Sequence, residues 1–269
     1  MQTLVQTLLA SRRGPKLAGT GELAGGGDGT VLQCCPNGAR PADAYPAVPV
    51  TPHRLARDAR AVSALGVFSV HVHPRDRDGR ESLDLDTVGA VTSAIREMAP
   101  RTEIGVTTAR WVEPDPVART EMIRQWGRLP AHARPDLASV NVHERGWQRV
   151  CAALDAVGIG VELGVWTSGD AVQLRKAGLP RGTARVLAEV TVTDPGIAVA
   201  EAVRILNALG PMPAPILLHG EEAGAWPVLE YAKRIDLDTR IGFEDTLECP
   251  GRLRRAVSNE ELVRHALTR

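Results

Sequence analysis

Apolar runs and amphipathic segments alternate regularly along the chain from residue 30 to the C-terminus. Short apolar runs bounded by glycine, proline or charged residues are typical of buried strands, and longer segments with apolar residues three and four apart are typical of helices. The pattern predicts eight strands, at Thr30–Cys35, Val67–His73, Thr102–Thr108, Asp136–Val142, Gly158–Trp166, Arg185–Thr191, Pro215–His219 and Thr239–Phe243. A helix is expected after each strand, at Pro52–Leu65, Asp84–Met98, Pro116–Gly127, Trp147–Val157, Ser168–Ala177, Pro195–Leu209, Gly224–Ile235 and Asn259–Leu267.

This alternation predicts the α/β class, and eight strand–helix units over about 240 residues fit a (β/α)8 TIM barrel. A doubly wound open sheet is the alternative, but the chain shows no obvious second domain and no dinucleotide-binding glycine fingerprint. Residues 29–269 are therefore expected to form a single barrel domain. Residues 1–28, which include the run Gly25-Gly26-Gly27, are expected to form a flexible extension, with room for a short helix over Leu4–Ala10.

Polar and ionisable residues collect directly after the predicted strands. In a (β/α)8 barrel the functional site lies at the ends where the strands run into the following loops. Loops are polar in any case, so this gathering is only a first indication. The residues concerned are Asn37–Arg40, His71–His73, Thr107–Thr108, Asn141–Glu144, Glu162, His219–Glu222 and Glu244–Asp245.

His71 and His73 are the sharpest feature of the chain. Residues two apart on a strand point to the same face, so the two imidazoles lie side by side at the end of an apolar strand. Such a pair can hold a divalent ion of the zinc type, although buried histidines can also be structural. Glu244 is the best third ligand, because strand eight adjoins strand one in a closed barrel and so lies near strand two. Three protein ligands with an open position are typical of catalytic zinc.

Other residues at the strand ends allow more than one interpretation. Asp245, next to Glu244, either orients a base or a water, or serves as a helix N-terminal carboxylate or a salt-bridged rim residue. Arg240 lies at the start of predicted strand eight, and an arginine at such a position is more often a structural ion-pair residue than a catalytic one. Arg40 and Arg75 can bind a substrate carboxylate, or can pair with acidic neighbours at the surface. Alternative ligands or acid–base groups are His143, Glu144, His219, Glu221 and Glu222.

Composition excludes several classes of protein. The 269 residues carry a formal net charge of zero without a block of Lys and Arg, so neither nucleic acid nor an anionic membrane is expected as a partner. The four cysteines form no C-x-x-C pair, which favours a reducing, cytoplasmic setting. No apolar run approaches transmembrane length. Basic residues follow the mildly apolar N-terminus, which is the wrong order for a secretory signal.

Three groups of residues resemble motifs of the β-keto acid cleavage enzymes. They are Pro49-Val50-Thr51-Pro52 before a helix, Val70-His71-Val72-His73-Pro74-Arg75-Asp76 with Gly79 and Asp84, and Gly242-Phe243-Glu244-Asp245-Thr246 followed by Ser258-Asn259-Glu260-Glu261-Leu262-Val263. The resemblance runs from about Thr30 to the C-terminus, and its two metal motifs lie at matching ends of the chain. It implies a zinc-dependent (β/α)8 barrel that is usually a homo-oligomer, here a dimer or tetramer.

The resemblance also implies a reaction. Members of this family condense a β-keto acid with acetyl-CoA and cleave the product to acetoacetate and a new acyl-CoA. The implied zinc ligands are His71, His73 and Glu244, and the implied catalytic residues are Arg240, Asp245 and Thr107. Arg240 and Asp245 would help to deprotonate acetyl-CoA. Thr107 aligns with a serine on strand three and keeps its hydroxyl.

The expected substrate-binding residues depart from the family pattern. Arg40 stands where the type member has a glutamate that reads a substrate amine, and Glu144 stands where it has a hydroxyl residue after strand four. The full set of substrate-binding candidates is Arg40, Glu144, Asn141 and Arg75. Because a guanidinium reverses the charge preference of a carboxylate, an uncharged or anionic substrate side chain is the hypothesis. Two rival functions are a CoA-independent metal-dependent aldolase or lyase, and a catalytically silent metal-binding homologue.

Overall fold

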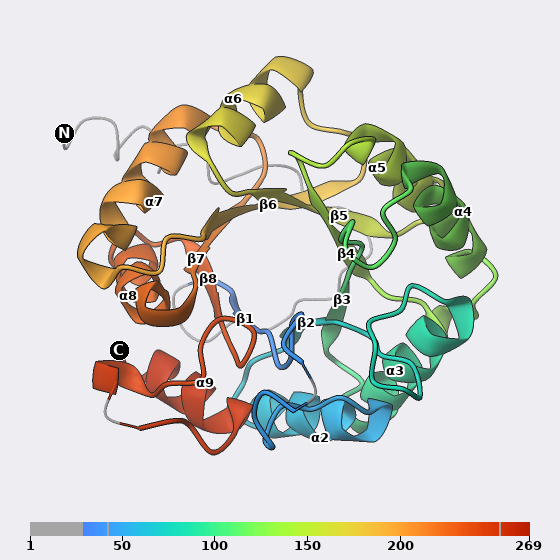
Figure 1. Ribbon diagram of the computed structural model, residues 1–269, viewed down its shortest axis with the longest axis horizontal. Helices are drawn as coiled ribbons and strands as arrows, with labels where there is room; N and C mark the ends of the chain where they lie inside the picture. Colours follow the sequence, from blue (N-terminus) through green and yellow to red (C-terminus); the bar gives the residue numbers. More distant parts are fainter. Residues whose placement is uncertain (1–28, 42, 253) are drawn as a thin grey trace.

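The computed structural model describes residues 29–41, 43–252 and 254–269. The expected N-terminal extension, with the short helix considered in it, lies outside the described residues. Within the described part, a ring of strands is surrounded by helices (Figure 1). No helix in these ranges is both long enough and apolar enough to cross a membrane.

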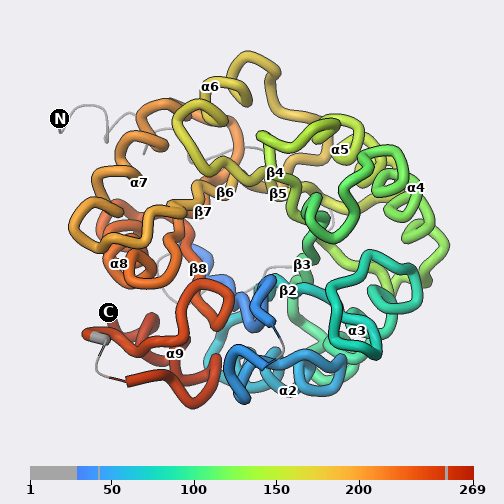
Figure 2. The backbone as a smooth tube through the Cα atoms, viewed as in Figure 1, coloured from blue at the N-terminus to red at the C-terminus, as the bar shows by residue number. Residues whose placement is uncertain are grey.

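The strands are parallel and close into a barrel in the order in which they occur along the chain. They are β1 (Leu32–Cys34), β2 (Ser69–Val72), β3 (Glu103–Thr107), β4 (Leu137–Asn141), β5 (Gly160–Val165), β6 (Thr183–Val190), β7 (Ile216–Gly220) and β8 (Asp238–Ile241). The helices are α2 (Pro52–Ser63), α3 (Leu85–Met98), α4 (Pro116–Trp126), α5 (Trp147–Ala156), α6 (Ser168–Ala177), α7 (Pro195–Leu209), α8 (Ala225–Arg234) and α9 (Asn259–Leu267). The ring closes where β1 pairs with β8, and the two strands lie side by side in the tube view (Figure 2).

The predicted (β/α)8 TIM barrel is confirmed, with every predicted strand and helix in its place and boundaries that differ by at most two residues. The largest informative difference is at β8, which ends at Ile241 although the apolar run continues to Phe243. The chain turns at Gly242, where a Cβ atom would meet the backbone oxygen of Cys35 at 2.0 Å. Three short 3-10 turns, at Ala131–Ala133, Glu222–Gly224 and Pro250–Arg252, have no counterpart in the sequence pattern.

Side-chain caps explain why several helices begin where they do. The Thr51 hydroxyl accepts a hydrogen bond from the Arg54 backbone N–H, and Pro52 occupies the first position of α2. Asp115 and Asp194 cap α4 and α7 in the same way, each followed by a proline. Ser258 caps α9 by accepting from the Glu261 N–H.

Alternation along the strands separates the apolar core from the barrel interior. Val70 and Val72 of β2 belong to the apolar core. His71, between them, lines a cavity inside the barrel mouth. Because successive side chains of a strand point to opposite faces, the packing that fixes the valines also fixes the direction of the histidine. The packed apolar core therefore holds polar side chains such as His71 in fixed positions facing the barrel interior.

Candidate active site

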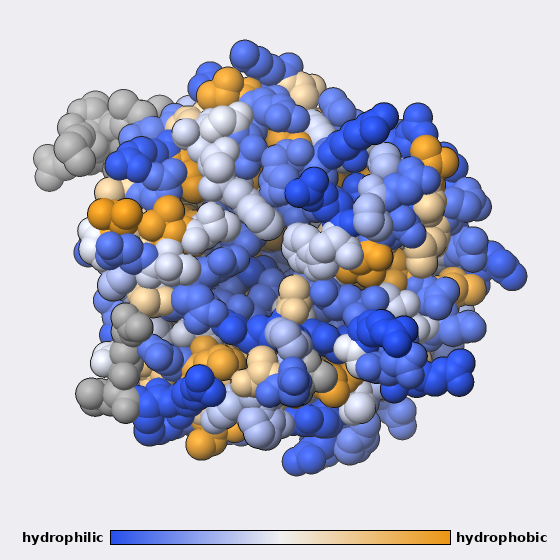
Figure 3. Space-filling view, in the orientation of Figure 1, coloured by the Kyte–Doolittle hydropathy of each residue, from blue (hydrophilic) through white to orange (hydrophobic). Residues whose placement is uncertain are grey.

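A cavity of about 300 Å³ opens at the carboxyl ends of the strands. In the space-filling view this face is hollowed near its centre, and most of the residues around the hollow are hydrophilic (Figure 3). The lining residues are Ala39, Arg40, His71, His73, Thr107, Trp111, Ser139, Asn141, Trp166, Leu187, Glu189, Glu221, Glu222, Arg240 and Glu244. Functional groups from nearly all strands therefore converge on one small space, as in other barrels of this type.

The three predicted metal ligands meet in this cavity. One donor atom from each of His71, His73 and Glu244 lies within 4.8 Å of the other two. His73 Nε2 is 3.6 Å from Glu244 Oε1, and the two imidazole rings are 5.3 Å apart between centroids. Glu244 Oε2 is buried without a hydrogen-bond partner in the described part of the chain. An orphaned carboxylate oxygen beside two imidazoles is a donor set that suits a zinc-type cation, so the residues present fit such an ion.

Each of the two histidines also faces a second carboxylate through its Nδ1 atom. His73 Nδ1 lies 2.5 Å from Glu81 Oε1, and His71 Nδ1 lies 3.6 Å from Glu162 Oε2. Burial lowers the pKa of His73, but the Glu244 charge and the hydrogen bonds to Glu244 and Glu81 raise it to about 9. Burial raises the pKa of Glu162, but the Arg185 charge and His71 lower it to about 2.

Arg240 and Asp245 form a buried pair beside the proposed ligands. Arg240 Nε donates to Asp245 Oδ1 at 3.0 Å, and Arg240 Nη2 donates to Glu244 Oε1 at 3.0 Å. Burial raises the pKa of Asp245, the Arg240 charge lowers it and the Glu244 charge raises it, and the balance is about 7. Arg240 points into the barrel from β8 and contacts the carboxylates of both Glu244 and Asp245. The sequence suggested a structural ion pair for this arginine, and the structure shows that the pair is part of the candidate site.

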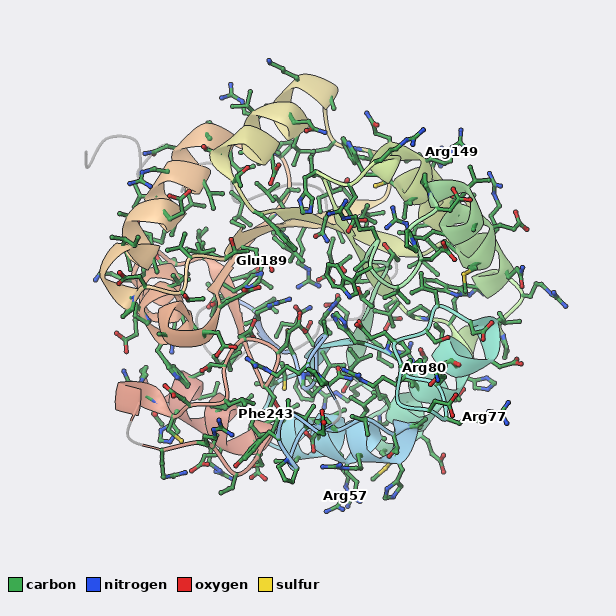
Figure 4. All side chains as sticks on the ribbon, viewed as in Figure 1. Arg57, Arg77, Arg80, Arg149, Glu189 and Phe243 are labelled. Carbon is green, nitrogen blue, oxygen red and sulfur yellow. The ribbon has the colours of Figure 1, made fainter. Side chains whose placement is uncertain are left out.

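His219 lies between Asp245 and Glu189, and Glu189 lines the cavity. His219 Nδ1 is 3.5 Å from Asp245 Oδ1, and its Nε2 is 3.6 Å from Glu189 Oε2. Burial and the Arg240 charge lower the pKa of His219, so the imidazole is neutral. Burial raises the pKa of Glu189, which borders the barrel opening from β6 (Figure 4). Sequence reasoning missed Glu189, although a lone carboxylate inside the apolar run Val186–Val190 was a usable signal.

The predicted substrate-binding residues divide into two groups. Asn141 and Arg40 line the cavity, as does the catalytic candidate Thr107. The Arg40 guanidinium is already paired: its Nη2 is 2.5 Å from Glu222 Oε1 and 3.3 Å from the Glu244 carbonyl oxygen.

Glu144 and Arg75 are buried elsewhere and do not line the cavity. Glu144 Oε2 is 2.5 Å from Arg119 Nη1, and its Oε1 accepts from Asn141 Nδ2 at 3.0 Å. Arg75 donates to the carbonyl oxygens of Gly79 at 3.0 Å and Gly38 at 2.9 Å. In the structure the charged groups of both residues are therefore engaged by neighbouring residues around the mouth of the barrel.

Two tryptophans that the sequence reasoning did not single out form an aromatic wall. Trp111 stacks on His73 with 6.5 Å between ring centroids, and it lies 6.5 Å from Trp166. The His143 ring packs on Trp166 with 4.5 Å between ring centroids. His143 therefore supports the aromatic wall, although it does not itself line the cavity. Only 3% of the residues are aromatic, so a tryptophan shortly after β3 was a signal from which Trp111 could have been predicted to belong to the site.

A second group of donor atoms, from Cys249, Glu261 and His265, also lies within 4.8 Å. Its carboxylate is already engaged: Glu261 Oε2 accepts from Arg254 Nη1 at 3.1 Å and from the Val257 N–H at 2.8 Å. Arg254 Nη2 donates to the other oxygen. An arginine that grips both carboxylate oxygens makes this cluster an ion-paired contact of α9.

Comparison with solved structures places the fold among known barrels. The complex of ObcA with oxaloacetate matches with a TM-score of 0.64 and 17% identity, over 83% of this chain and 63% of the ObcA chain. The ternary complex of ObcA with a C4-CoA adduct and oxalate matches with a TM-score of 0.63 over the same shares. The 3-dehydroquinate dehydratase of Geobacillus kaustophilus HTA426 matches with a TM-score of 0.58 and 12% identity, over 90% of this chain and 91% of that one. The chain spans less than two thirds of the ObcA chain, and these likenesses show the fold.

The family follows from the sequence match together with the site. The model of the β-keto acid cleavage enzymes matches residues 30–268, which is almost the whole of the described barrel. Two of the motifs that carried the resemblance supply His71, His73 and Glu244, and these three residues meet in one cavity. The chain belongs to the β-keto acid cleavage enzyme family.

Proposed function

We propose that this protein is a zinc-dependent β-keto acid cleavage enzyme that uses acetyl-CoA as its second substrate and releases acetoacetate and a new acyl-CoA. One observation carries the proposal: Arg240 lines the same cavity as His71, His73 and Glu244, and it contacts both Glu244 and the buried Asp245. A carbonyl-polarising centre and a base are the two groups that carbon–carbon bond cleavage next to a ketone requires.

The balance of atoms assigns the first proton. A carbanion at C2 of the β-keto acid attacks the thioester carbonyl of acetyl-CoA and expels the CoA thiolate. The thiolate then attacks the keto carbon, and the bond between C2 and C3 breaks. The acyl fragment leaves as acyl-CoA, and the remaining carbanion takes back a proton to become acetoacetate. The proton therefore leaves the β-keto acid, and not acetyl-CoA as the family resemblance implied.

His71, His73 and Glu244 would hold the metal ion, which when bound supplies Lewis-acid polarisation of the keto oxygen. Asp245 is the base. Its pKa of about 7 leaves a good share of the carboxylate ready to accept a proton near neutral pH. Arg240 holds this carboxylate through its Nε and keeps a positive charge beside the carbanion that forms. Thr107 and Asn141 line the same cavity and would bind the substrate carboxylate or carbonyl.

The preferred side chain of the β-keto acid depends on the residues at the edge of the cavity, chiefly Arg40. Arg40 favours an uncharged or anionic side chain, but its pairing with Glu222 reduces the charge that it offers. We therefore expect an uncharged side chain to be preferred over an anionic one. Arg40→Glu with cationic, neutral and anionic β-keto acids tests this expectation, and an unchanged preference would remove Arg40 from specificity.

The function itself is tested by incubating the zinc-loaded protein with the same β-keto acids, with and without acetyl-CoA. Acetoacetate and the matching acyl-CoA are expected only in the presence of acetyl-CoA, with Asp245→Asn as the inactive control. Cleavage without acetyl-CoA would indicate a metal-dependent aldolase or lyase. A protein that binds no zinc and turns over none of the acids would be a silent homologue. Size-exclusion chromatography tests the expected dimer or tetramer.

The proposed cytoplasmic setting agrees with the cysteines. All four are buried and free of disulfide bonds in the structure. Burial raises the pKa of the Cys34, Cys35 and Cys151 thiols, so these groups stay protonated near neutral pH.

A further inference from the structure

A carboxylate faces the Nδ1 atom of each proposed histidine ligand. His73 Nδ1 contacts Glu81 Oε1 at 2.5 Å. His71 Nδ1 and Glu162 Oε2 face each other at 3.6 Å, which is slightly too long for a hydrogen bond. Both of these atoms are buried, and neither has another partner in the ranges that the structure covers. Since buried polar atoms are rarely left unpaired, the two are each other's natural partners after a shift of a few tenths of an ångström.

Gln33 and Arg185 hold the Glu162 carboxylate in a fixed orientation. Its Oε1 accepts from Gln33 Nε2 at 3.1 Å and lies 3.2 Å from Arg185 Nε. Both neighbours are donors, so Oε1 must be an acceptor, and Oε2 is the atom left for His71. A carboxylate accepts hydrogen bonds and has no proton to give, so the imidazole must carry its proton on Nδ1. The lone pair of His71 then sits on Nε2.

The residues under Glu162 form a polar layer where barrels of this type usually hold branched apolar side chains. Ser69 Oγ donates to Glu103 Oε1 at 2.9 Å, and Arg185 Nη2 donates to the same oxygen. Gln33 Nε2 also contacts Ser69 Oγ at 3.2 Å. Charged groups are costly to bury, and an apolar layer would be no less stable. The layer therefore calls for a role beyond stability, and Glu162 connects it to the proposed ligand His71.

Glu81 is held in a corresponding way from the rim. Its backbone pairs with that of Arg75, and its Oε2 accepts from Trp111 Nε1 at 3.1 Å. The Trp111 ring stacks on His73. One oxygen of Glu81 is thus assigned to tryptophan and the other to the imidazole, as Glu162 divides its oxygens between the polar layer and His71.

We propose that Glu162 and Glu81 are positioning residues that hold His71 and His73 with a proton on Nδ1 and with Nε2 directed to the metal ion. The inference rests on the metal site of the proposed function and adds the groups that prepare it. Partners of this kind typically change metal affinity by roughly ten- to hundredfold when they are removed. The polar layer and Trp111 act one step further out, by fixing which carboxylate oxygen faces each ring.

The amide variants Glu162→Gln and Glu81→Gln test the proposal, because the neighbouring donors dictate how each amide sits. In Glu162→Gln the amide oxygen must face Gln33 and Arg185, so the amide NH2 group faces His71 Nδ1. The imidazole then moves its proton to Nε2, which blocks the ligand position. In Glu81→Gln the Trp111 N–H takes the amide oxygen, with the same result at His73. We expect each variant to bind Zn²⁺ roughly ten- to hundredfold more weakly than the parent protein, measured by competition with a chromophoric chelator.

Two comparisons separate positioning from a structural role. Glu103→Gln disturbs the same polar layer without touching an imidazole, so it should lower the melting temperature about as much as Glu162→Gln and leave Zn²⁺ affinity within about threefold. Trp111→Phe keeps the stacked ring and removes the donor, so in the double variant with Glu81→Gln the amide can turn its oxygen to His73. Zn²⁺ affinity should then return to within about threefold of Trp111→Phe alone. NMR of the His71 ring nitrogens should show the proton on Nδ1 in the parent and on Nε2 in Glu162→Gln.

The outcomes are distinct from those of the proposed function. Equal Zn²⁺ affinity in Glu162→Gln and Glu103→Gln, or an unrescued double variant, would overturn the inference whatever the turnover. A parent protein that binds no Zn²⁺ overturns it as well, together with the metal site. A parent that binds Zn²⁺ and cleaves no β-keto acid, with weakened binding in the two amide variants, upholds the inference while the proposed reaction fails.

Discussion

Replacing Gly242 by alanine should damage both stability and the metal site, because this glycine passes directly over the backbone of Cys35. A Cβ atom there would lie 2.0 Å from the Cys35 oxygen, 2.5 Å from its carbonyl carbon and 2.8 Å from its nitrogen. Real Cβ contacts essentially never fall below 3.0 Å, so the two segments must separate by about 1 Å. All three opposing atoms are backbone, and no side-chain rotation can relieve the clash.

The magnitude follows from the packing. Overpacking in a well-packed region typically costs about 1–3 kcal/mol, and a clash with rigid backbone belongs at the upper end. For a chain of this size about 3 kcal/mol corresponds to a fall in melting temperature of roughly 6–12 °C. The same displacement breaks the hydrogen bond from the Glu244 N–H to the Cys35 oxygen, now 3.0 Å, and so moves a proposed ligand. A shift of about 1 Å in a catalytic group can lower activity roughly hundredfold.

Thermal unfolding and Zn²⁺ titration of Gly242→Ala measure the two effects separately. Gly169→Ala is the matched control, because the nearest atom to its Cβ is the Thr167 hydroxyl at an ordinary 3.4 Å. We expect the control to melt within about 2 °C of the parent protein or slightly above it. If Gly242→Ala behaves like the control in both melting temperature and Zn²⁺ affinity, the reasoning about the turn after β8 is refuted.

Three further predictions concern single groups. Asp245→Asn should lower kcat by roughly 10²- to 10⁴-fold while Zn²⁺ affinity stays within about threefold, and a parallel loss of both would argue against a base. Glu261 has its pKa lowered to about 2, chiefly by the hydrogen bond from Arg254, against a usual value near 4.5. The depressed pKa stabilises the fold above about pH 4.5, and that stabilisation is lost as the pH falls through about 2, so Glu261→Gln should lower the melting temperature at pH 7 and match the parent at pH 2. Burial raises the pKa of Cys151 to about 12, so this thiol should resist iodoacetamide at pH 8 in the native protein and react in guanidinium. Rapid native labelling at Cys151, mapped by peptide mass spectrometry, would contradict its burial.

The proposed metal site shows which parts of a site can be reached from sequence. The imidazoles of His71 and His73 share a face because strand side chains repeat every two residues, and this periodicity is local. Glu244 could be added because closure of the barrel brings β8 next to β1, which pairs with β2. Both steps depend on the topology and on strand ends, and the pattern of apolar residues reports these well.

The predicted substrate-binding residues show which details such reasoning does not reach. Arg75 and Glu144 lie at strand ends as predicted, but both are engaged by neighbours outside the cavity lining. Glu144 pairs with Arg119 of α4, which lies 25 positions away along the chain. Charged side chains are long and choose among partners within a few ångströms, so a strand-end position does not say whether the charged group faces the cavity.

The sequence by itself determined the eight strand–helix units, the order of the barrel and the meeting of His71, His73 and Glu244 at its mouth. These features follow from periodicity, helix capping and parallel closure, all of which act along the chain or between neighbouring strands. Only the tertiary structure decided which carboxylate stands behind each imidazole and which arginine is already paired. Glu162 reaches His71 across the barrel interior, and Glu81 reaches His73 by a turn of the β2–α3 loop. Partner choice in a buried site depends on distances of a few tenths of an ångström between segments far apart in sequence, and such distances exist only after the barrel has closed.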